Sequence, residues 1–220
     1  MPLQNRVDPF GEIHAVAERG LFTGNRGIIH DPDTKTLLAR RWTLKAWIIC
    51  RCDFEGVRRE PMGRNRTGRP GEPAGTGWTE LFFLDEVTAL AAGHRPCFYC
   101  RRERASDFCR RFGNALAIGE PRAPMLDSRL HEERLASGGK PAALGKRELA
   151  CLPDGAMFAD GDTAYAWREG AALRWSFSGY GERVAPASLE GRKLRVLTPP
   201  TTLAVLENGF RPVWHPSAGP

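Results

Sequence analysis

Two cysteines separated by two residues carry the clearest chemistry in this sequence. Cys97 and Cys100 lie in the stretch 93–102, between a glycine that suits a helix end and a run of arginines. A Cys-x-x-Cys pair at a sharp turn presents both sulfurs to one point, and such a pair is half of a tetrahedral zinc site. The spacing therefore predicts a zinc ion whose other ligands come from elsewhere in the chain.

The other ligands are expected among the remaining cysteines and the histidines. The candidates are Cys50 and Cys52, followed by His30, His94 and His14. The stretch 45–52 is rich in β-branched and aromatic residues, which predicts a strand, and alternation then puts Cys50 and Cys52 on one face. Four thiolates, with Cys97 and Cys100, would tie a sheet to a basic helix, and the metal would contribute folding energy.

Buried free cysteine is the alternative interpretation of these thiols, because an unligated Cys behaves as a small apolar side chain. Cys109 lies beside Phe108 on a predicted helix and is expected in the core. Cys151 stands alone in the sequence and is expected to be a core or surface residue rather than a ligand.

The stretch 82–101 resembles the second half of the Ada-type zinc-binding domain. The shared features are a Phe-Phe strand, a short helix that ends in Ala-Gly-aromatic-Arg-Pro, and then Cys-x-x-Cys. The resemblance implies that Cys97 and Cys100 are zinc ligands near DNA phosphates. In that family a zinc-bound cysteine repairs methylated DNA phosphotriesters, and related copies serve other DNA-handling proteins. The family's first thiol pair would fall in the loop 61–77, which contains no cysteine.

Clustered arginines predict a surface for nucleic acid, because the planar guanidinium binds two phosphate oxygens at once. The residues expected on this surface are Arg58, Arg59, Arg64, Arg66, Arg95, Arg101 and Arg102. Tyr99 and Trp78 are placed to stack on unpaired bases. The Gly/Pro-rich loop 61–77 is either a mobile linker or a basic arm that becomes ordered on a phosphate backbone. The plain alternative is that these arginines are a solvated surface.

A second interpretation of the sequence is a zinc-dependent enzyme that acts on nucleic acid. Asp127 and His131 lie one helical turn apart in a predicted helix, 125–136, and His30 is a third candidate for acid–base work or metal binding. Such a group would suit a nuclease. The stretch 96–100 also matches half of the zinc deaminase signature, but no upstream His-x-Glu accompanies it. A third reading is a structural zinc protein whose basic surface binds another protein.

Composition sets the wider limits. The chain has 220 residues, a formal net charge of +6 and a pI near 9.2, which favours polyanionic partners. No apolar run is long enough to cross a bilayer, and the N-terminus lacks the layout of a signal peptide. We therefore expect a cytoplasmic protein without a membrane partner. In that compartment the six cysteines favour metal binding, catalysis or burial over disulfides.

The pattern along the chain predicts an α+β fold. An antiparallel sheet and a zinc knuckle occupy 1–118, a helical connector 119–150, and a small β-rich region 151–220, together in one compact body. Asp85 is the expected N-cap of a short helix, and a second helix is expected over 98–112. The segments 88–96 and 203–212 resemble each other. Both end a helix with a glycine, an aromatic ring, Arg and Pro, which indicates a shared helix exit.

Overall fold

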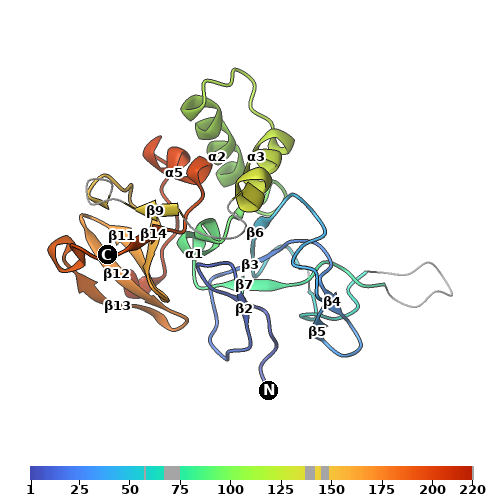
Figure 1. Cartoon of the computed structure of the whole chain (residues 1–220). Helices are drawn as coiled ribbons and strands as arrows, with labels where there is room; N and C mark the ends of the chain where they lie inside the picture. Colours follow the sequence, from blue (N-terminus) through green and yellow to red (C-terminus); the bar gives the residue numbers. More distant parts are fainter. Residues whose placement is uncertain (57, 67–74, 137–141, 145–148, 220) are drawn as a thin grey trace.

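A computed structural model describes residues 1–56, 58–66, 75–136, 142–144 and 149–219 of the chain. These residues form a mixed α and β structure with two larger sheets, a two-stranded ribbon and several helices (Figure 1). In this part of the chain, no helix combines the length and the apolar character that a bilayer crossing requires.

The first sheet is built from the N-terminal half of the chain, in the order β2-β1-β7-β3-β6-β8. Its strands are β1 (Arg6–Val7), β2 (Ile13–His14), β3 (Phe22–Asn25), β6 (Ile48–Arg51), β7 (Leu81–Phe83) and β8 (Arg95–Pro96). The pairs β1–β7 and β6–β8 are parallel, so the prediction of a wholly antiparallel sheet is wrong. Tight hairpins force antiparallel pairing, whereas long connections such as those before β7 and β8 also permit parallel pairing.

A small ribbon lies beside this sheet. Its strands β4 (His30–Asp31) and β5 (Thr36–Leu37) pair antiparallel around a turn. Asp31 stabilises that turn, because its side chain accepts a hydrogen bond from the Asp33 N–H at 2.8 Å.

The second sheet is antiparallel throughout its described pairs, in the order β13-β12-β11-β10-β14-β9. Its strands are β9 (Ala142–Leu144), β10 (Met157–Asp160), β11 (Thr163–Arg168), β12 (Ala171–Ser176), β13 (Gly179–Val184) and β14 (Leu194–Val196). Short 3-10 helices, η1 (Pro186–Leu189) and η2 (Pro216–Ala218), adjoin it. The strand β9 comes from the segment that the sequence assigned to a helical connector.

Four helices complete the described structure. They are α1 (Glu86–Ala91), α2 (Arg102–Ala115), α3 (Ala123–Ala136) and α5 (Pro200–Glu207). Figure 1 shows α1 between the two sheets and the other helices grouped on one side. The prediction that the second helix starts at residue 98 is wrong, because α2 begins only after both thiols of the Cys-x-x-Cys pair.

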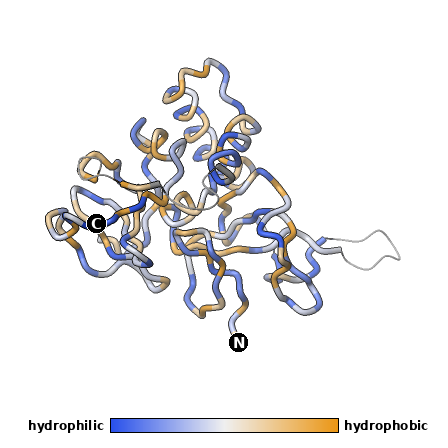
Figure 2. The backbone as a smooth tube through the Cα atoms, viewed as in Figure 1, coloured by the Kyte–Doolittle hydropathy of each residue, from blue (hydrophilic) through white to orange (hydrophobic). Residues whose placement is uncertain are grey.

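The short helix α1 joins two hydrophobic cores. Leu90 packs in a cluster with first-sheet residues such as Phe83, and with Phe108 and Phe210. Val87 and Ala91 pack in a second cluster with residues of the second sheet, such as Met157. Figure 2 shows hydrophobic segments of α1 and of neighbouring β7 side by side near the middle of the molecule. Because α1 is buried on all sides, it packs against both sheets and holds them in a fixed relative position.

Both predicted helix exits are present. Gly93 and Gly209 have φ values of +82° and +90°. After the first, the His94 N–H donates to the Ala89 carbonyl at 3.0 Å; after the second, the Phe210 N–H donates to the carbonyl of Val205 at 3.2 Å. These 6→1 bonds, together with the 5→2 bonds of the two glycines, are Schellman motifs. The first of them turns the chain from α1 into β8 and towards the paired thiols.

Candidate metal centre

Three cysteine sulfurs converge at one end of the first sheet. The Sγ atoms of Cys50, Cys97 and Cys100 lie within 4.8 Å of one another. Cys97 is buried, and the other two are half-buried. In the described part of the chain, no other group of three His, Cys, Asp or Glu side chains is gathered this closely. The cluster brings together thiols that are far apart in the sequence.

Parallel pairing of β6 with β8 explains why Cys50 meets Cys97. Ile49 pairs with Pro96, and the Cys97 N–H donates to the Ile49 carbonyl at 3.0 Å. The two cysteines are therefore the next residues along adjacent strands that run in the same direction. Proline at 96 is compatible with this position because β8 is the last strand in the sheet order, and Pro has no N–H to donate.

A turn at the start of α2 brings Cys100 back to Cys97. The Arg101 N–H donates to the Cys97 carbonyl at 3.1 Å, which closes the turn. Within it, the Tyr99 N–H donates to the Cys97 sulfur at 3.3 Å. Backbone donors aimed at sulfur stabilise the thiolate form, and a thiolate is what a metal ion binds.

The three thiols influence one another's ionisation. Hydrogen bonds from Cys100 and Cys50, followed by backbone N–H groups, lower the pKa of Cys97 despite its burial. Hydrogen bonds to Cys100 and Cys97, with burial, raise the pKa of Cys50. The bond to Cys50 lowers the pKa of Cys100, but the bond to Cys97 and burial raise it overall. One thiolate is thus stabilised by its neighbours, and full ionisation of all three requires a cation among them.

The donor set fits a tetrahedral thiophilic metal ion. With Zn–S bonds of about 2.3 Å, tetrahedral geometry requires sulfurs about 3.8 Å apart. The three sulfurs lie within 4.8 Å of one another, so each pair is at most about 1 Å further apart than this geometry requires. The cluster could therefore hold a metal ion through three protein ligands. This leaves a fourth position for water or another group.

The expectation for Cys52 is not matched by its position. The strand β6 ends at Arg51, so the alternation that was to place Cys50 and Cys52 on one face stops before Cys52. Cys52 is exposed, and its Sγ lies 3.5 Å from the Leu21 carbonyl oxygen. The structure therefore does not bring Cys52 into the cluster.

The remaining predicted ligands also lie elsewhere. His94 packs against Phe83 and Trp47, at ring distances of 4.7 Å and 5.2 Å. His14 contacts Asp8 through Nε2 at 2.8 Å. Cys109 is buried in α2, which confirms its expected core position.

Two of the arginines expected to contact phosphate are buried in ion pairs instead. Arg95 is 5% exposed and binds the Asp127 carboxylate through two N–H groups, at 2.9 Å and 2.8 Å. Arg101 pairs with buried Glu86 at 2.8 Å. Placing Arg95 and Arg101 on an open phosphate-binding surface is therefore wrong, since their charges are compensated inside the molecule. A sequence shows a charge but not the partner that the fold supplies.

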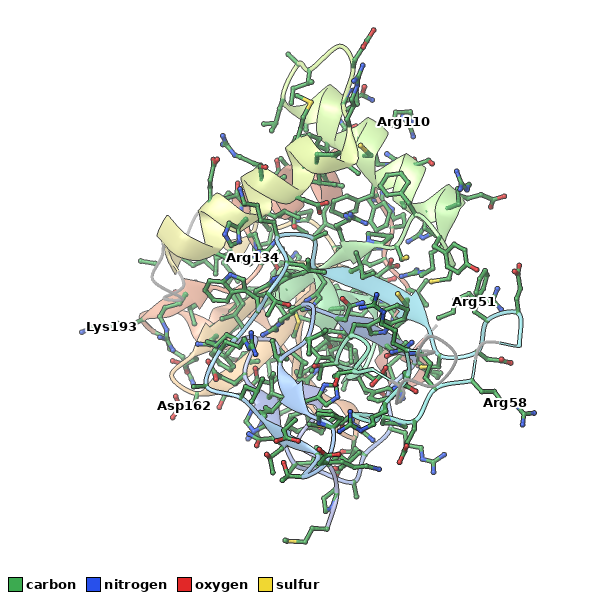
Figure 3. All side chains as sticks on the ribbon, turned by 90° about the vertical axis from the view of Figure 1, so that its right-hand side faces the viewer. Arg51, Arg58, Arg110, Arg134, Asp162 and Lys193 are labelled. Atoms are coloured by element: carbon green, nitrogen blue, oxygen red, sulfur yellow. The ribbon has the colours of Figure 1, made fainter. Side chains whose placement is uncertain are left out.

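The other expected arginines differ in their environment. Arg59 pairs with Glu80 at 2.6 Å, and Arg64 pairs with Asp33 at 2.8 Å. Arg58, Arg66 and Arg102 are exposed. In Figure 3, Arg58 projects outward on the same side of the molecule as Arg51.

The suggested catalytic residues do not form a group in the described structure. Asp127 is committed to Arg95. His131 packs edge-on against Trp42 at 5.8 Å, and His30 bonds Thr79 through Nδ1 at 2.7 Å. Burial lowers the pKa of both histidines, so their neutral forms are favoured. The candidates Asp127, His131 and His30 therefore have structural partners rather than a shared site.

Two residues beside the cysteine cluster, Arg51 and Phe54, were missed by sequence reasoning. Tyr99, which was predicted from the sequence to stack on bases, lies between Cys97 and Cys100, is 71% exposed and packs edge-on against Phe54 at 5.2 Å. The guanidinium of Arg51 lies 5.9 Å from the centre of the Phe54 ring. The only available signal was the position of Arg51 next to Cys50, and Phe54 had no signal because it lies beyond the strand.

Comparisons with protein-family models, with curated proteins and with solved structures found no match for this chain. The resemblance of residues 82–101 to the Ada-type domain therefore stays a prediction.

Proposed function

We propose that this protein binds one Zn²⁺ through Cys50, Cys97 and Cys100 and uses the surface around that ion to bind nucleic acid, DNA in the first instance. The convergence of three sulfurs from two distant segments is the observation that carries the proposal. Thiolates favour Zn²⁺ over hard cations, and the ligand spacing suits its tetrahedral preference. The ion would join β6 to the turn before α2, so it would contribute to folding.

The exposed surface beside the cluster supports nucleic acid as the partner. Tyr99 offers an exposed ring for stacking. Arg51 lies against the Phe54 ring that packs on Tyr99, and exposed Arg102 begins α2 shortly after Tyr99. Among the described residues, no carboxylate pairs with the side chain of either arginine. Stacking platforms next to free guanidinium groups are typical of proteins that bind single strands. A role in DNA repair, which the short Ada-type resemblance suggests, belongs to the same proposal.

A zinc-dependent enzyme is the second candidate, and one observation favours it. Three protein ligands with an open fourth position are the arrangement of catalytic zinc sites, whereas structural sites are almost always closed by four. Asp127, His131 and His30 are occupied elsewhere, so they do not supply the acid or base. Binding is therefore the function that we favour.

The proposal is tested with metal-loaded protein and fluorescent oligonucleotides. Anisotropy titrations with single- and double-stranded DNA over a salt series should show binding that weakens as salt rises. Tyr99→Ala should weaken binding roughly 5- to 150-fold, the range of one lost stacking contact. Arg102→Ala should reduce the salt slope by about one phosphate contact.

Arg110→Ala is the matched control for Arg102, because Arg110 lies on the same helix and pairs with Asp107. It should leave the affinity unchanged. Absence of measurable binding to either form of DNA at low salt would contradict the proposal, and so would equal losses for Arg102→Ala and Arg110→Ala.

A further inference from the structure

A cavity of about 370 Å³ lies beyond the opposite end of β3 and β6 from the cysteine cluster. Three of its wall residues are large hydrophobic side chains that stay exposed: Ile28, Leu44 and Trp78. The wall residue Gly27 comes two residues after Asn25, which pairs with Ile48 at the start of β6. Cys50 lies near the other end of β6, so the cavity and the cysteine cluster are at opposite ends of this strand pair. The volume is within the usual range for sites that hold small molecules.

Trp78 is the main apolar surface of this cavity. The residue is 44% exposed, and the Arg59 guanidinium lies over the ring at 3.7 Å from its centroid. Arg59 is itself fixed, because its Nε donates to the Glu80 carboxylate at 2.6 Å. A large aromatic side chain that is braced on one face and open elsewhere suits a flat partner.

Hydrogen bonds hold the walls in place. Buried Glu80 also accepts from the Met62 N–H at 2.9 Å. The Thr43 hydroxyl accepts from the Ile28 N–H at 2.8 Å, and the Asn65 amide donates to the Glu60 carbonyl at 2.7 Å. A cavity whose walls are already ordered loses little conformational entropy when it binds a ligand.

The charge of the lining favours an anion. Arg59 and Arg66 both border the cavity, and no Asp or Glu is among its wall residues. Glu80 compensates Arg59. Arg66 is exposed, and its guanidinium has no ion pair within the described residues. A ligand that places a flat apolar group on Trp78 and a negative group near Arg66 would satisfy both features.

We propose that this cavity takes one unstacked base of a single-stranded nucleic acid, with the base on Trp78 and an adjacent phosphate on Arg66. The inference rests on the proposed function and assigns it a second contact point, separate from Tyr99 and the metal. The base would be bound by stacking, which tolerates any base, and the phosphate by a charge-assisted hydrogen bond.

The test uses the full, metal-loaded chain with adenosine monophosphate, ribose 5-phosphate and a fluorescent single-stranded oligonucleotide. Calorimetry should show that adenosine monophosphate binds at least about tenfold more tightly than base-free ribose 5-phosphate, because stacking supplies the difference. Trp78→Leu should remove this preference and weaken oligonucleotide binding roughly 5- to 150-fold. Arg66→Ala should weaken the binding of adenosine monophosphate and of the oligonucleotide. It should not affect the fold, because Arg66 is exposed.

Two controls separate this inference from the proposed function. Trp42→Leu, at another exposed tryptophan, should leave the affinity for adenosine monophosphate and for the oligonucleotide unchanged. Tyr99→Ala should weaken the binding of the oligonucleotide but not that of adenosine monophosphate. Oligonucleotide binding that survives both Trp78→Leu and Arg66→Ala would overturn the cavity assignment and leave the proposed function standing. Binding of adenosine monophosphate without any binding of oligonucleotide would overturn both.

Discussion

Arg26 and His94 form a buried polar pair beside the first sheet. The Arg26 Nε donates to the Nε2 of His94 at 3.3 Å, and its Nη1 donates to the Gly11 carbonyl at 3.0 Å. Burial, then the nearby charges of Arg41 and Arg134, lower the pKa of Arg26 to about 9. Burial, then Arg26 and Arg134, lower the pKa of His94 well below its ordinary value. His94 is therefore neutral in the folded protein and accepts the bond from Arg26.

This pair predicts a loss of stability in mild acid. The folded-state pKa of His94 is depressed, so below about pH 6.5 the unfolded chain binds a proton that the folded chain does not. Stability should fall by up to about 1.4 kcal/mol per pH unit from this residue alone. His94→Gln keeps an acceptor for Arg26 but cannot titrate, so its unfolding free energy should fall less steeply.

Urea unfolding at pH 7.5, 6.5 and 5.5 measures the free energy of unfolding of the wild type and of His94→Gln. His30 and His131, whose pKa values are also lowered, contribute equally to the two and cancel in the comparison. Identical pH slopes for the wild type and His94→Gln would show that His94 is not the buried neutral group.

The helix α1 depends on the residue that precedes it. Asp85 caps the helix by accepting from the Thr88 N–H at 2.8 Å. Its other oxygen accepts from the Tyr180 hydroxyl at 2.8 Å and from the His215 N–H at 3.0 Å. One carboxylate thus binds the helix start, a strand of the second sheet and the C-terminal segment.

Asp85→Asn is expected to destabilise the protein by about 2 kcal/mol or more. Asparagine keeps the shape, but its NH₂ group cannot accept, so two buried donors on that side lose their partner. Asp107→Asn is the matched control, since Asp107 makes surface pairs with Arg110 and Arg111 and should cost about 0.5 kcal/mol. Urea denaturation compares them; an Asp85→Asn protein as stable as the control variant would contradict the role of this carboxylate.

Local signals were enough to predict some elements. The N-cap at Asp85 and the left-handed glycines at Gly93 and Gly209 follow from rules that operate within a few residues. Thr201 and Thr202 are of a residue type favoured at N-caps. However, the N-cap of α5 is Pro199, and Thr201 instead binds Glu133 of α3. That bond joins residues far apart in sequence, so a local rule cannot foresee it.

Long-range pairing explains the other failures. The parallel contact of β6 with β8 is invisible in the sequence, although it is what brings Cys50 to Cys97. The strand β13 has no clear signal in the sequence, because Gly179 and Gly181 at its start indicate a turn. The candidate cysteines were predicted by type and spacing, and the exclusion of Cys52 depended on where a strand ends.

At the scale of the molecule, one hydrophobic core combines residues from all three predicted regions of the chain. Phe108 of α2 packs edge-on against Phe210 at 5.0 Å, and both share a cluster with Val7 near the N-terminus. The boundaries near 118 and 150 remain predictions. The net charge of +6 already counts every carboxylate of the chain. Some arginines pair with buried carboxylates such as Asp127 and Glu86. Nucleic-acid affinity should therefore follow the free arginines and not the total charge.

The metal content of the purified chain tests the central claim most directly. Elemental analysis should find one zinc per wild-type chain and one in each control, Cys109→Ser and Cys151→Ser, whose cysteines lie outside the cluster. Cys50→Ser should lose most of the zinc, because the site would keep only two protein ligands. A wild-type chain without bound metal, or a Cys50→Ser chain that retains a full equivalent, would contradict the account.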